Sequence, residues 1–453
     1  MKSIVSFGLA LVLLISLLLG GLAGVRALGP AQAGGATTRV SVASDGTEGN
    51  DWAQCPSISA DGRYVAFESD ADNLTAGDTN AASDIFVNDR QTGETTRVSV
   101  ASSGLEANGG SRSPAISANG RNIAFFSSAS NLTPDDNNGT YDVFVHDRQM
   151  GETTRVSVDS NGVEANGYSA NPSLSADGRY VAFESQANNL TPGDTNGAYD
   201  VFVHDRQTAE TTRISVATGG TQGNGDSEAP SISADGRYVA FRSQASNLAA
   251  DDTNGMYDVF VHDRQTGETE RVSTATGGAQ ANHFSYELAL SANGRYVAFD
   301  SLASNLAPGD AAGTWDVFVH DRQTGETTHV SVTSDGARAN GDSLDPSISA
   351  DGRYVAFQSD ANNLAPGDAN SAYDLFIHDR QTGETTCVSV TSAGVQGNGA
   401  SDTPSISADG RYVAFRSAAS DLVTGDANGT LDVFVHDRGA PPGSTFYLPI
   451  ALR

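Results

Sequence analysis

Residues 57–67 read Ser-Ile-Ser-Ala-Asp-Gly-Arg-Tyr-Val-Ala-Phe, and this segment returns six more times along the chain with small changes. Its Asp-Gly or Asn-Gly pair begins at positions that are always 58 residues apart, namely Asp61, Asn119, Asp177, Asp235, Asn293, Asp351 and Asp409. A constant period without insertions is typical of an architecture in which each repeat packs against its neighbours. The sequence therefore predicts one body built from seven equal modules.

Each repeat predicts four short antiparallel strands. In the second repeat we expect them near 115–117, at 122–126, at 142–146 and at 153–158. Asn119-Gly120 forms a two-residue hairpin turn between the first two strands, and Gly151 marks a compact turn between the last two. The second and third strands are apolar on both faces, so each sheet needs a neighbour against each side. Four-stranded sheets stacked in this way are the blades of a β-propeller.

The phase of the repeats predicts how the ring closes. A strand of the fourth type, residues 37–42, precedes the first repeat, and no such strand follows the third-type strand at 432–436. The N-terminal strand can therefore complete the last blade and leave no open edge. The predicted fold is an all-β, seven-bladed β-propeller of four-stranded antiparallel blades over residues 37–438.

The unit Ser59-Ala60-Asp61-Gly62-Arg63-Tyr64-Val65-Ala66-Phe67 resembles the repeats of the TolB-like, WD40-like (PD40) β-propellers of bacteria, over about residues 37–438. The resemblance implies the fold. It does not select an activity, because that superfamily includes assembly proteins, peptidase-associated propellers and binding proteins. The chain departs from TolB itself by its seven long repeats and by the lack of a preceding α/β domain, which argues against a role in TolB's envelope complex.

The two ends lie outside the repeats. Lys2, an apolar run over 4–19 and Ala31-Gln32-Ala33 predict a secretory signal peptide over residues 1–33. The apolar stretch extends to Val25, so an uncleaved N-terminal anchor is the alternative. Either way we expect an exported protein, in the periplasm, at the cell surface or outside the cell. Residues 439–453 form a C-terminal tail.

The charge excludes some partners. The formal net charge is −29 and Lys2 is the single lysine, so nucleic acid and anionic membrane are repelled. Membrane contact is expected only through an uncleaved N-terminal segment. Cys55 and Cys387 each interrupt a repeat position and lie in different repeats, without a CxxC motif or a neighbouring histidine cluster. Neither a zinc site nor a thiol nucleophile is predicted from them.

Chain direction sorts the connections onto two faces. The turns after the first and third strands are short and define a tight-turn face, whereas the other two connections are long and define a long-loop face. Binding residues concentrate on long loops of rigid scaffolds. In the fifth repeat these loops carry a candidate sugar- or peptide-binding patch, formed by His283, Phe284, Tyr286 and Trp315. Drift in one redundant copy is the alternative explanation.

The loop between the second and third strands, here called the acidic loop, repeats an Asp-x-Asn-x-x-x-Asp pattern. Oxygen ligands at this spacing could begin a calcium site. The alternative is that Asp and Asn cap loop amides. Calcium is the one ion suggested, and the sequence requires no cofactor. The candidate ligands are Asp78, Asn80, Asp84, Asp136, Asn138, Asp142, Asp194, Asn196, Asp200, Asp252, Asn254, Asp258, Asp368, Asn370, Asp374, Asp426, Asn428 and Asp432.

Catalysis requires unlike groups in one place, whereas this sequence predicts near-identical groups copied around a ring. Six histidines share one repeat position in different blades, too far apart to hold one metal: His146, His204, His262, His320, His378 and His436. No Gly-x-Ser-x-Gly, HExxH or phosphate-binding loop is present. We therefore expect an exported, monomeric binding or scaffolding propeller for a protein or glycan, and not an enzyme. The alternative is an extracellular hydrolase or lyase whose site lies at the central channel on the long-loop face.

Overall fold

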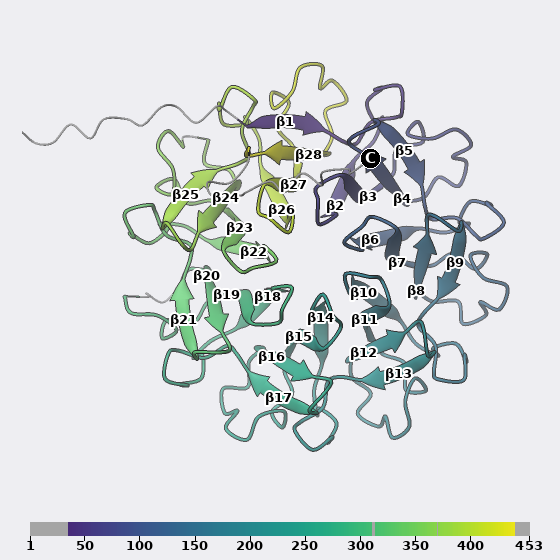
Figure 1. Cartoon of the computed structure of the whole chain (residues 1–453), viewed down its shortest axis with the longest axis vertical. Helices are drawn as coiled ribbons and strands as arrows, with labels where there is room; N and C mark the ends of the chain where they lie inside the picture. The colour runs from purple at the N-terminus through teal and green to yellow at the C-terminus, as the bar shows by residue number, and fades with distance from the viewer. Residues whose placement is uncertain (1–34, 310–312, 369, 440–453) are drawn as a thin grey trace, which may run out of the picture. The chain divides into compact units, whose positions relative to one another are not determined.

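The structure is a computed structural model that describes residues 35–309, 313–368 and 370–439. In these segments 28 strands form seven four-stranded antiparallel sheets. Figure 1 shows the sheets as blades around a central axis, which confirms the predicted seven-bladed β-propeller. None of the described segments forms a helix that could cross a membrane. The predicted signal over 1–33 and all of the predicted tail after residue 439 lie outside the described residues.

The strands of each blade are named A to D from the axis outward (Figure 1). The A strands are β2 (Ala53–Ile58), β6 (Ser111–Ile116), β10 (Ser169–Leu174), β14 (Ser227–Ile232), β18 (Ser285–Leu290), β22 (Ser343–Ile348) and β26 (Ser401–Ile406). The B strands are β3 (Tyr64–Ser69), β7 (Asn122–Ser127), β11 (Tyr180–Ser185), β15 (Tyr238–Ser243), β19 (Tyr296–Ser301), β23 (Tyr354–Ser359) and β27 (Tyr412–Ser417). The C strands are β4 (Asp84–Asp89), β8 (Asp142–Asp147), β12 (Asp200–Asp205), β16 (Asp258–Asp263), β20 (Asp316–Asp321), β24 (Asp374–Asp379) and β28 (Asp432–Asp437). The D strands are β5 (Glu94–Arg97), β9 (Glu152–Arg155), β13 (Glu210–Arg213), β17 (Glu268–Arg271), β21 (Glu326–His329), β25 (Glu384–Cys387) and β1 (Ala36–Arg39).

The N-terminal strand closes the ring as predicted. The last sheet has the order β1-β28-β27-β26, so the D strand of the seventh blade comes from the other end of the chain. In the register of β1 and β28, Thr37 lies opposite His436 and Arg39 opposite Phe434. Figure 1 shows β1 beside β28, and no blade in the described chain is left incomplete.

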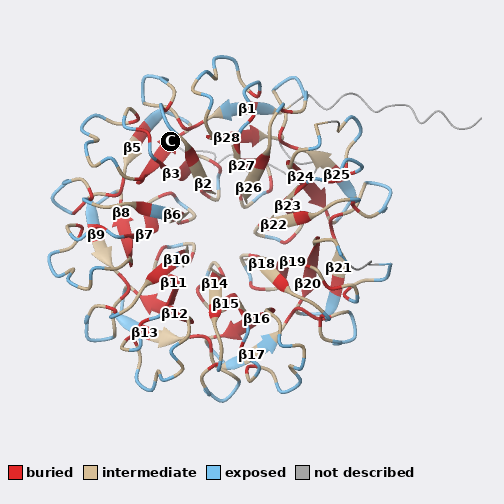
Figure 2. Cartoon of the chain, turned by 180° about the vertical axis from the view of Figure 1, so that it is seen from behind, coloured by how far each residue is buried: buried red, intermediate tan, exposed pale blue. Residues whose placement is uncertain are grey.

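The core lies between blades as well as within them. Val65 and Phe67 of β3 pack toward Val433 and Val435 of the seventh blade, whereas Ala66 on the opposite face packs toward the second blade. Figure 2 shows that burial is greatest in the B and C strands and falls toward the D strands. This pattern agrees with the apolar residues on both faces of the second and third strands.

The fourth strand is shorter than predicted. It was expected over 153–158, but β9 ends at Arg155. Two residues later the Ser157 Oγ accepts a hydrogen bond from the Val143 N–H at 3.1 Å and donates to Asp142 Oδ1 at 2.5 Å. The ladder ends because this hydroxyl takes the place of a main-chain partner. The A strand is longer than predicted, since β6 begins at Ser111 and contains a bulge.

The A–B turns join neighbouring blades on the tight-turn face. The Ala60 N–H donates to the Ala118 carbonyl oxygen at 3.0 Å, and the same bond links each turn to the next until Ala408 donates to Ala60. Above these bonds the Tyr64 ring lies against Gly120 of the next blade. The Arg148 guanidinium carbon lies 4.6 Å from the centre of that ring. Successive blades are thus held by a closed circle of seven backbone hydrogen bonds and, at six of the seven interfaces, by arginine–tyrosine stacking.

Candidate functional site at the central channel

The A strands enclose the central channel, where a cavity of about 560 Å³ is lined by all seven blades. Each blade contributes the third residue of its A strand, and in six blades this residue precedes a proline. In those six blades the residue has a φ between 47° and 52°, at the bulge where the pairing of A and B strands shifts. Non-glycine residues rarely adopt this conformation, and such strain is often found at ligand sites.

The side chains at this position differ in every blade. They are Cys55, Ser113, Asn171, Ala229, Glu287, Asp345 and Thr403. The second residue of the A strand also differs in every blade: Gln54, Arg112, Ala170, Glu228, Tyr286, Leu344 and Asp402. The expectation that all chemistry is copied around the ring is therefore wrong for the channel, whose lining is assembled from residues that occur once.

Acidic side chains of the B strands hold the strained backbone. Glu68 Oε2 accepts the Ser113 N–H at 2.8 Å, and Glu184 Oε2 accepts the Ala229 N–H at 2.9 Å. Asp300 accepts the Asp345 N–H of the next blade at 3.1 Å, and it also accepts the Glu287 N–H of its own blade at 3.0 Å. Three of these four bonds cross from one blade to the next, so the positions of the channel side chains depend on buried carboxylates.

The channel has an uneven distribution of charge. Arg242 pairs with Glu287 at 2.7 Å and with Glu228 at 3.2 Å. Asp300 is buried, and burial raises its pKa well above the ordinary value. Burial, followed by the charge of Glu287, raises the pKa of Asp345 to about 6. A carboxyl group with such a pKa can exchange a proton near neutral pH.

Aromatic rings lie beside the charged side chains of Arg242, Glu228 and Glu287, close to where the A and C strands begin. Tyr286 lies 3.8 Å from the Arg242 guanidinium carbon. Its ring centre is 6.4 Å from that of Trp315 and 5.4 Å from that of Tyr257. A second chain of rings, with neighbouring centres 5.4 to 6.2 Å apart, consists of Phe126, Tyr141, Tyr168 and Tyr199.

The predicted aromatic patch is thus brought together in part. Tyr286 and Trp315 are in ring contact. His283 and Phe284 contact each other at 5.0 Å, and among the described residues no ring contact joins this pair to the first. Sequence reasoning missed Arg242 and the second chain of rings. A column-by-column comparison of the seven repeats would have drawn attention to Arg242, Phe126 and Tyr168, whose positions differ between repeats. It would not have singled out Tyr141 and Tyr199, because their position is tyrosine in four of the seven repeats.

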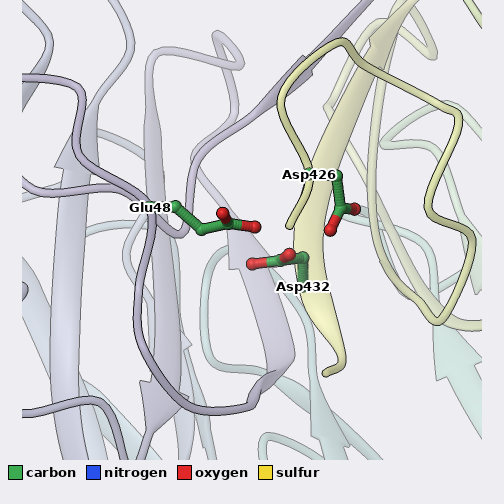
Figure 3. A group of neighbouring side chains, drawn as sticks. All are labelled: Glu48, Asp426 and Asp432. Carbon is green, nitrogen blue, oxygen red and sulfur yellow. The ribbon is translucent and has the colours of Figure 1, made fainter. Parts of the chain in front are cut away.

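The predicted calcium ligands lie outside the channel, in the acidic loops. Three groups of carboxylates approach closely there, each with a glutamate from the next D–A loop that the prediction did not include: Asp78, Asp84 and Glu106; Asp136, Asp142 and Glu164; and Asp426, Asp432 and Glu48. Figure 3 shows the last group, in which residues from both ends of the chain point toward one another.

A strand-D arginine already reaches each of these three groups. Arg97 Nη1 lies 3.3 Å from Asp78, 3.5 Å from Asp84 and 2.5 Å from Glu106. Asn80 donates its Nδ2 to Asp84 Oδ2 at 2.9 Å, while its Oδ1 accepts the Ala82 N–H. The amide oxygen therefore caps the loop. Calcium binding here stays a prediction, and the melting temperature with and without a chelator is the measurement that would detect it.

The other repeats vary this arrangement. Gln222, Gln280 and Gln396 replace the glutamate in the third, fourth and sixth blades. In the fifth blade His329 and Arg338 both contact Asp316. In the sixth, Cys387 stands where the arginine would be, next to Asp374. The sixth acidic loop therefore differs from the others in having no strand-D arginine or histidine.

The surroundings of the six repeated histidines and of the two cysteines favour packing roles over catalytic ones. His204 is buried, its Nδ1 lies 2.9 Å from Thr211 Oγ1, and burial lowers its pKa to about 4. The other five occupy the same place in their own blades, as expected for packing residues. Cys55 and Cys387 are free, and burial raises the pKa of each thiol to about 12. Such thiols are protonated at neutral pH and poor nucleophiles.

No family model and no curated protein matches this chain. Among solved structures, an oligogalacturonate lyase from Vibrio parahaemolyticus is 14% identical, covers 88% of this chain and 93% of its own, and has a TM-score of 0.53. An oligogalacturonate lyase in complex with manganese is 14% identical, with coverages of 90% and 93% and the same TM-score. TolB from Acinetobacter baumannii is 20% identical, with a TM-score of 0.39, and the match covers 67% of this chain and 58% of TolB. At 14% identity, the likeness to the two lyase structures shows a shared β-propeller fold.

Proposed function

We propose that this protein is an exported binding propeller that holds one protein or glycan ligand at the long-loop mouth of its central channel. The observation that supports this proposal is the set of seven unlike residues lining the channel within an otherwise uniform repeat. A symmetric body with one asymmetric cavity provides one distinct site, whereas its outer loops provide repeated surfaces. We also propose that the chain is a member of the PD40 repeat family and that residues 1–33 direct its export.

Neutral sequence drift at an equal rate in all repeat positions does not account for the variation among the channel residues. The C–D turn is largely exposed, and its glycine is the residue that the positive φ requires. Beyond that glycine, the whole sequence Gln-Thr-Gly-Glu recurs unchanged in the first, fourth, fifth and sixth repeats, beginning at Gln91, Gln265, Gln323 and Gln381. If the copies had drifted without selection, these turns would differ at least as much as the channel. Variation is instead greatest at the second and third residues of the A strands, which argues that the channel has been fitted to a ligand.

The chemistry of the mouth suits a ligand with both apolar and polar surfaces. The half-buried rings of Tyr286 and Trp315 offer stacking faces. Arg242, Glu228 and Glu287 beside them offer charged hydrogen-bonding groups. Sugars and peptide side chains both use such a combination of aromatic surface and polar contacts.

The experiment begins with arrays of glycans and of peptides, followed by calorimetric titration of the hits. We expect one site per chain, and at least a tenfold loss of affinity for Tyr286→Ala combined with Trp315→Ala, because each aromatic contact contributes about 1 kcal/mol. The matched control is Leu105→Ala combined with Val163→Ala, which alters exposed apolar residues of the repeated D–A loops. Seven equal sites per chain, or loss of binding only in the control, would refute the proposal.

A second candidate function rests on Asp345. This channel residue has its pKa raised to about 6 by burial and lies beside Asp300 and Glu287. It could act as a general acid or base in a hydrolase or lyase. If the array hits are turned over, Asp345→Asn should abolish product formation and leave ligand affinity within about threefold. Turnover that survives this substitution would exclude Asp345 as the catalytic group.

A further inference from the structure

The interface between the second and third blades lacks a side chain that the other six interfaces contain. At each of those six a tyrosine at the start of the B strand contacts two arginines, with guanidinium carbons 4.4 to 4.8 Å from the ring centre. One arginine belongs to the same blade and the other to the next. In the second blade the corresponding residue is Asn122, and no ring is present for Arg121 and Arg206.

Both arginines nevertheless keep their anchors. Arg121 binds Asp147 through Nε at 2.9 Å and through Nη2 at 2.6 Å, the same distances as between Arg63 and Asp89 beside Tyr64. Arg206 Nη1 donates to the Gly178 carbonyl oxygen at 2.8 Å, as Arg148 donates to Gly120 at 2.8 Å. Neither anchor involves a ring, so both guanidinium groups stay anchored at this interface although the tyrosine is missing.

The gap at Asn122 is part of a cavity open to solvent. This cavity has a volume of about 960 Å³ and is lined by Asn122 together with both Arg121 and Arg206. The cavity at Tyr64 has a volume of about 600 Å³ and is not lined by Arg63, the counterpart of Arg121. Asn122 itself is buried against Gly178, and its Oδ1 accepts from Arg206 Nη1 at 3.0 Å. The Arg121 side chain is 40% exposed, so the cavity can be entered from the tight-turn face.

We propose that this gap binds a planar aromatic ring, which takes the place of the missing tyrosine side chain. The ring would contact the faces of Arg121 and Arg206 through cation–π interactions. The Asn122 Nδ2, which donates to the Asp177 carbonyl oxygen over 3.4 Å and has a second hydrogen, would donate a hydrogen bond to a hydroxyl group on the ring. A phenol therefore has the matching chemistry, either as a free small molecule or as a tyrosine side chain of a peptide. This site is separate from the channel and does not depend on the function proposed there.

The test measures binding of phenol to the purified protein by ligand-observed NMR, with cyclohexanol as the non-aromatic probe. We expect phenol to bind the natural protein, and Asn122→Tyr to lower its affinity at least tenfold by filling the gap with the residue used at the other six interfaces. Equal phenol binding to both proteins, or equal binding of cyclohexanol and phenol, would overturn the proposal.

A second variant tests the same chemistry by gain of binding. Tyr64→Asn reproduces the gap at the neighbouring interface, where Arg63 and Arg148 keep their anchors, and should add a second phenol site. If it folds and adds none, the proposal fails. N-acetyltyrosinamide distinguishes the source of the ring: binding of both probes supports a site that accepts peptide side chains, and binding of phenol alone supports a site for free aromatic molecules.

Discussion

At Gly120 the backbone φ is +72°, and a Cβ would lie 2.2 Å from Cδ2 of Tyr64. We predict that Gly120→Ala lowers the free energy of unfolding by about 3 kcal/mol, the sum of a left-handed backbone penalty and an overpacked contact. Gly104→Ala is the matched control, because Gly104 has a φ of +83° and open space around its Cα. It should cost about 1 kcal/mol, from the backbone term alone. Equal losses in denaturant titrations would contradict the proposed role of the Tyr64 contact.

The same residues show how far sequence reasoning reaches at this scale. The Asn119-Gly120 turn could be predicted, because its conformation depends on neighbours in the chain. The contact of Gly120 with Tyr64 could not, since it depends on how closely two blades stack. For the same reason Tyr286 and Trp315 could be assigned to the long-loop face, whereas the position of Arg242 between Glu228 and Glu287 required the structure.

Among the strands, β1 has the greatest effect on the ring, because it joins the two ends of the fold. A chain that begins at Val40 loses the four residue pairs with β28 and the contact of the Thr37 N–H with Ser392 Oγ at 3.0 Å. We predict a loss of about 4 kcal/mol of stability, at about 1 kcal/mol for each ladder hydrogen bond. The melting temperature should recover when a synthetic peptide of residues 34–42 is added.

A control peptide with proline at position 38 should not restore the melting temperature, because proline cannot donate to a ladder. Full stability of the shortened chain without any peptide would mean that β1 does not hold the ring closed. Closure by β1 could be predicted from the order of strand types alone. The early end of the fourth strands could not, because it depends on the hydroxyl of Ser157 and its equivalents competing with the backbone.

For the whole molecule, six histidines with lowered pKa values predict sensitivity to acid. His204 is neutral in the folded protein down to about pH 4, whereas in the unfolded chain it takes up a proton near pH 6.5. The stability that it contributes is therefore complete above pH 6.5 and is lost as the pH falls toward 4. Buried carboxylates with raised pKa values, such as Asp142, act in the opposite sense, so a single histidine must be tested.

The first blade suggests which substitution should replace a single histidine in this test. There Asn88 replaces the histidine, and its Nδ2 donates to Thr95 Oγ1 at 3.0 Å. The Thr211 hydroxyl donates to the Val158 carbonyl oxygen, so His204 Nδ1 must also be a donor. We predict that the free energy of unfolding of His204→Asn, measured relative to that of the natural protein, is about 2 kcal/mol higher at pH 5 than at pH 7.5. A gain that is the same at both pH values would show that the histidine is not the acid-sensitive group.

The ring as a whole could be predicted because identical spacing leaves few arrangements that bury every sheet. The same regularity made the lining of the channel difficult to predict from the sequence. Cys55, Asp345 and their equivalents are separated by multiples of 58 residues and interrupt a nearly constant pattern, so each looks like an isolated exception. Only the closed structure places these exceptions around one cavity.

The hydrogen bonds that run from Ala60 through every A–B turn and back from Ala408 to Ala60 have no first or last member. Every blade is therefore an interior blade, and the place where the polypeptide starts is arbitrary with respect to this circle. A circularly permuted chain, with its natural ends joined and new ends placed at any other D strand, would retain all seven linkages. The number of blades, in contrast, cannot change by one without reopening the circle and refitting the residues that face the axis.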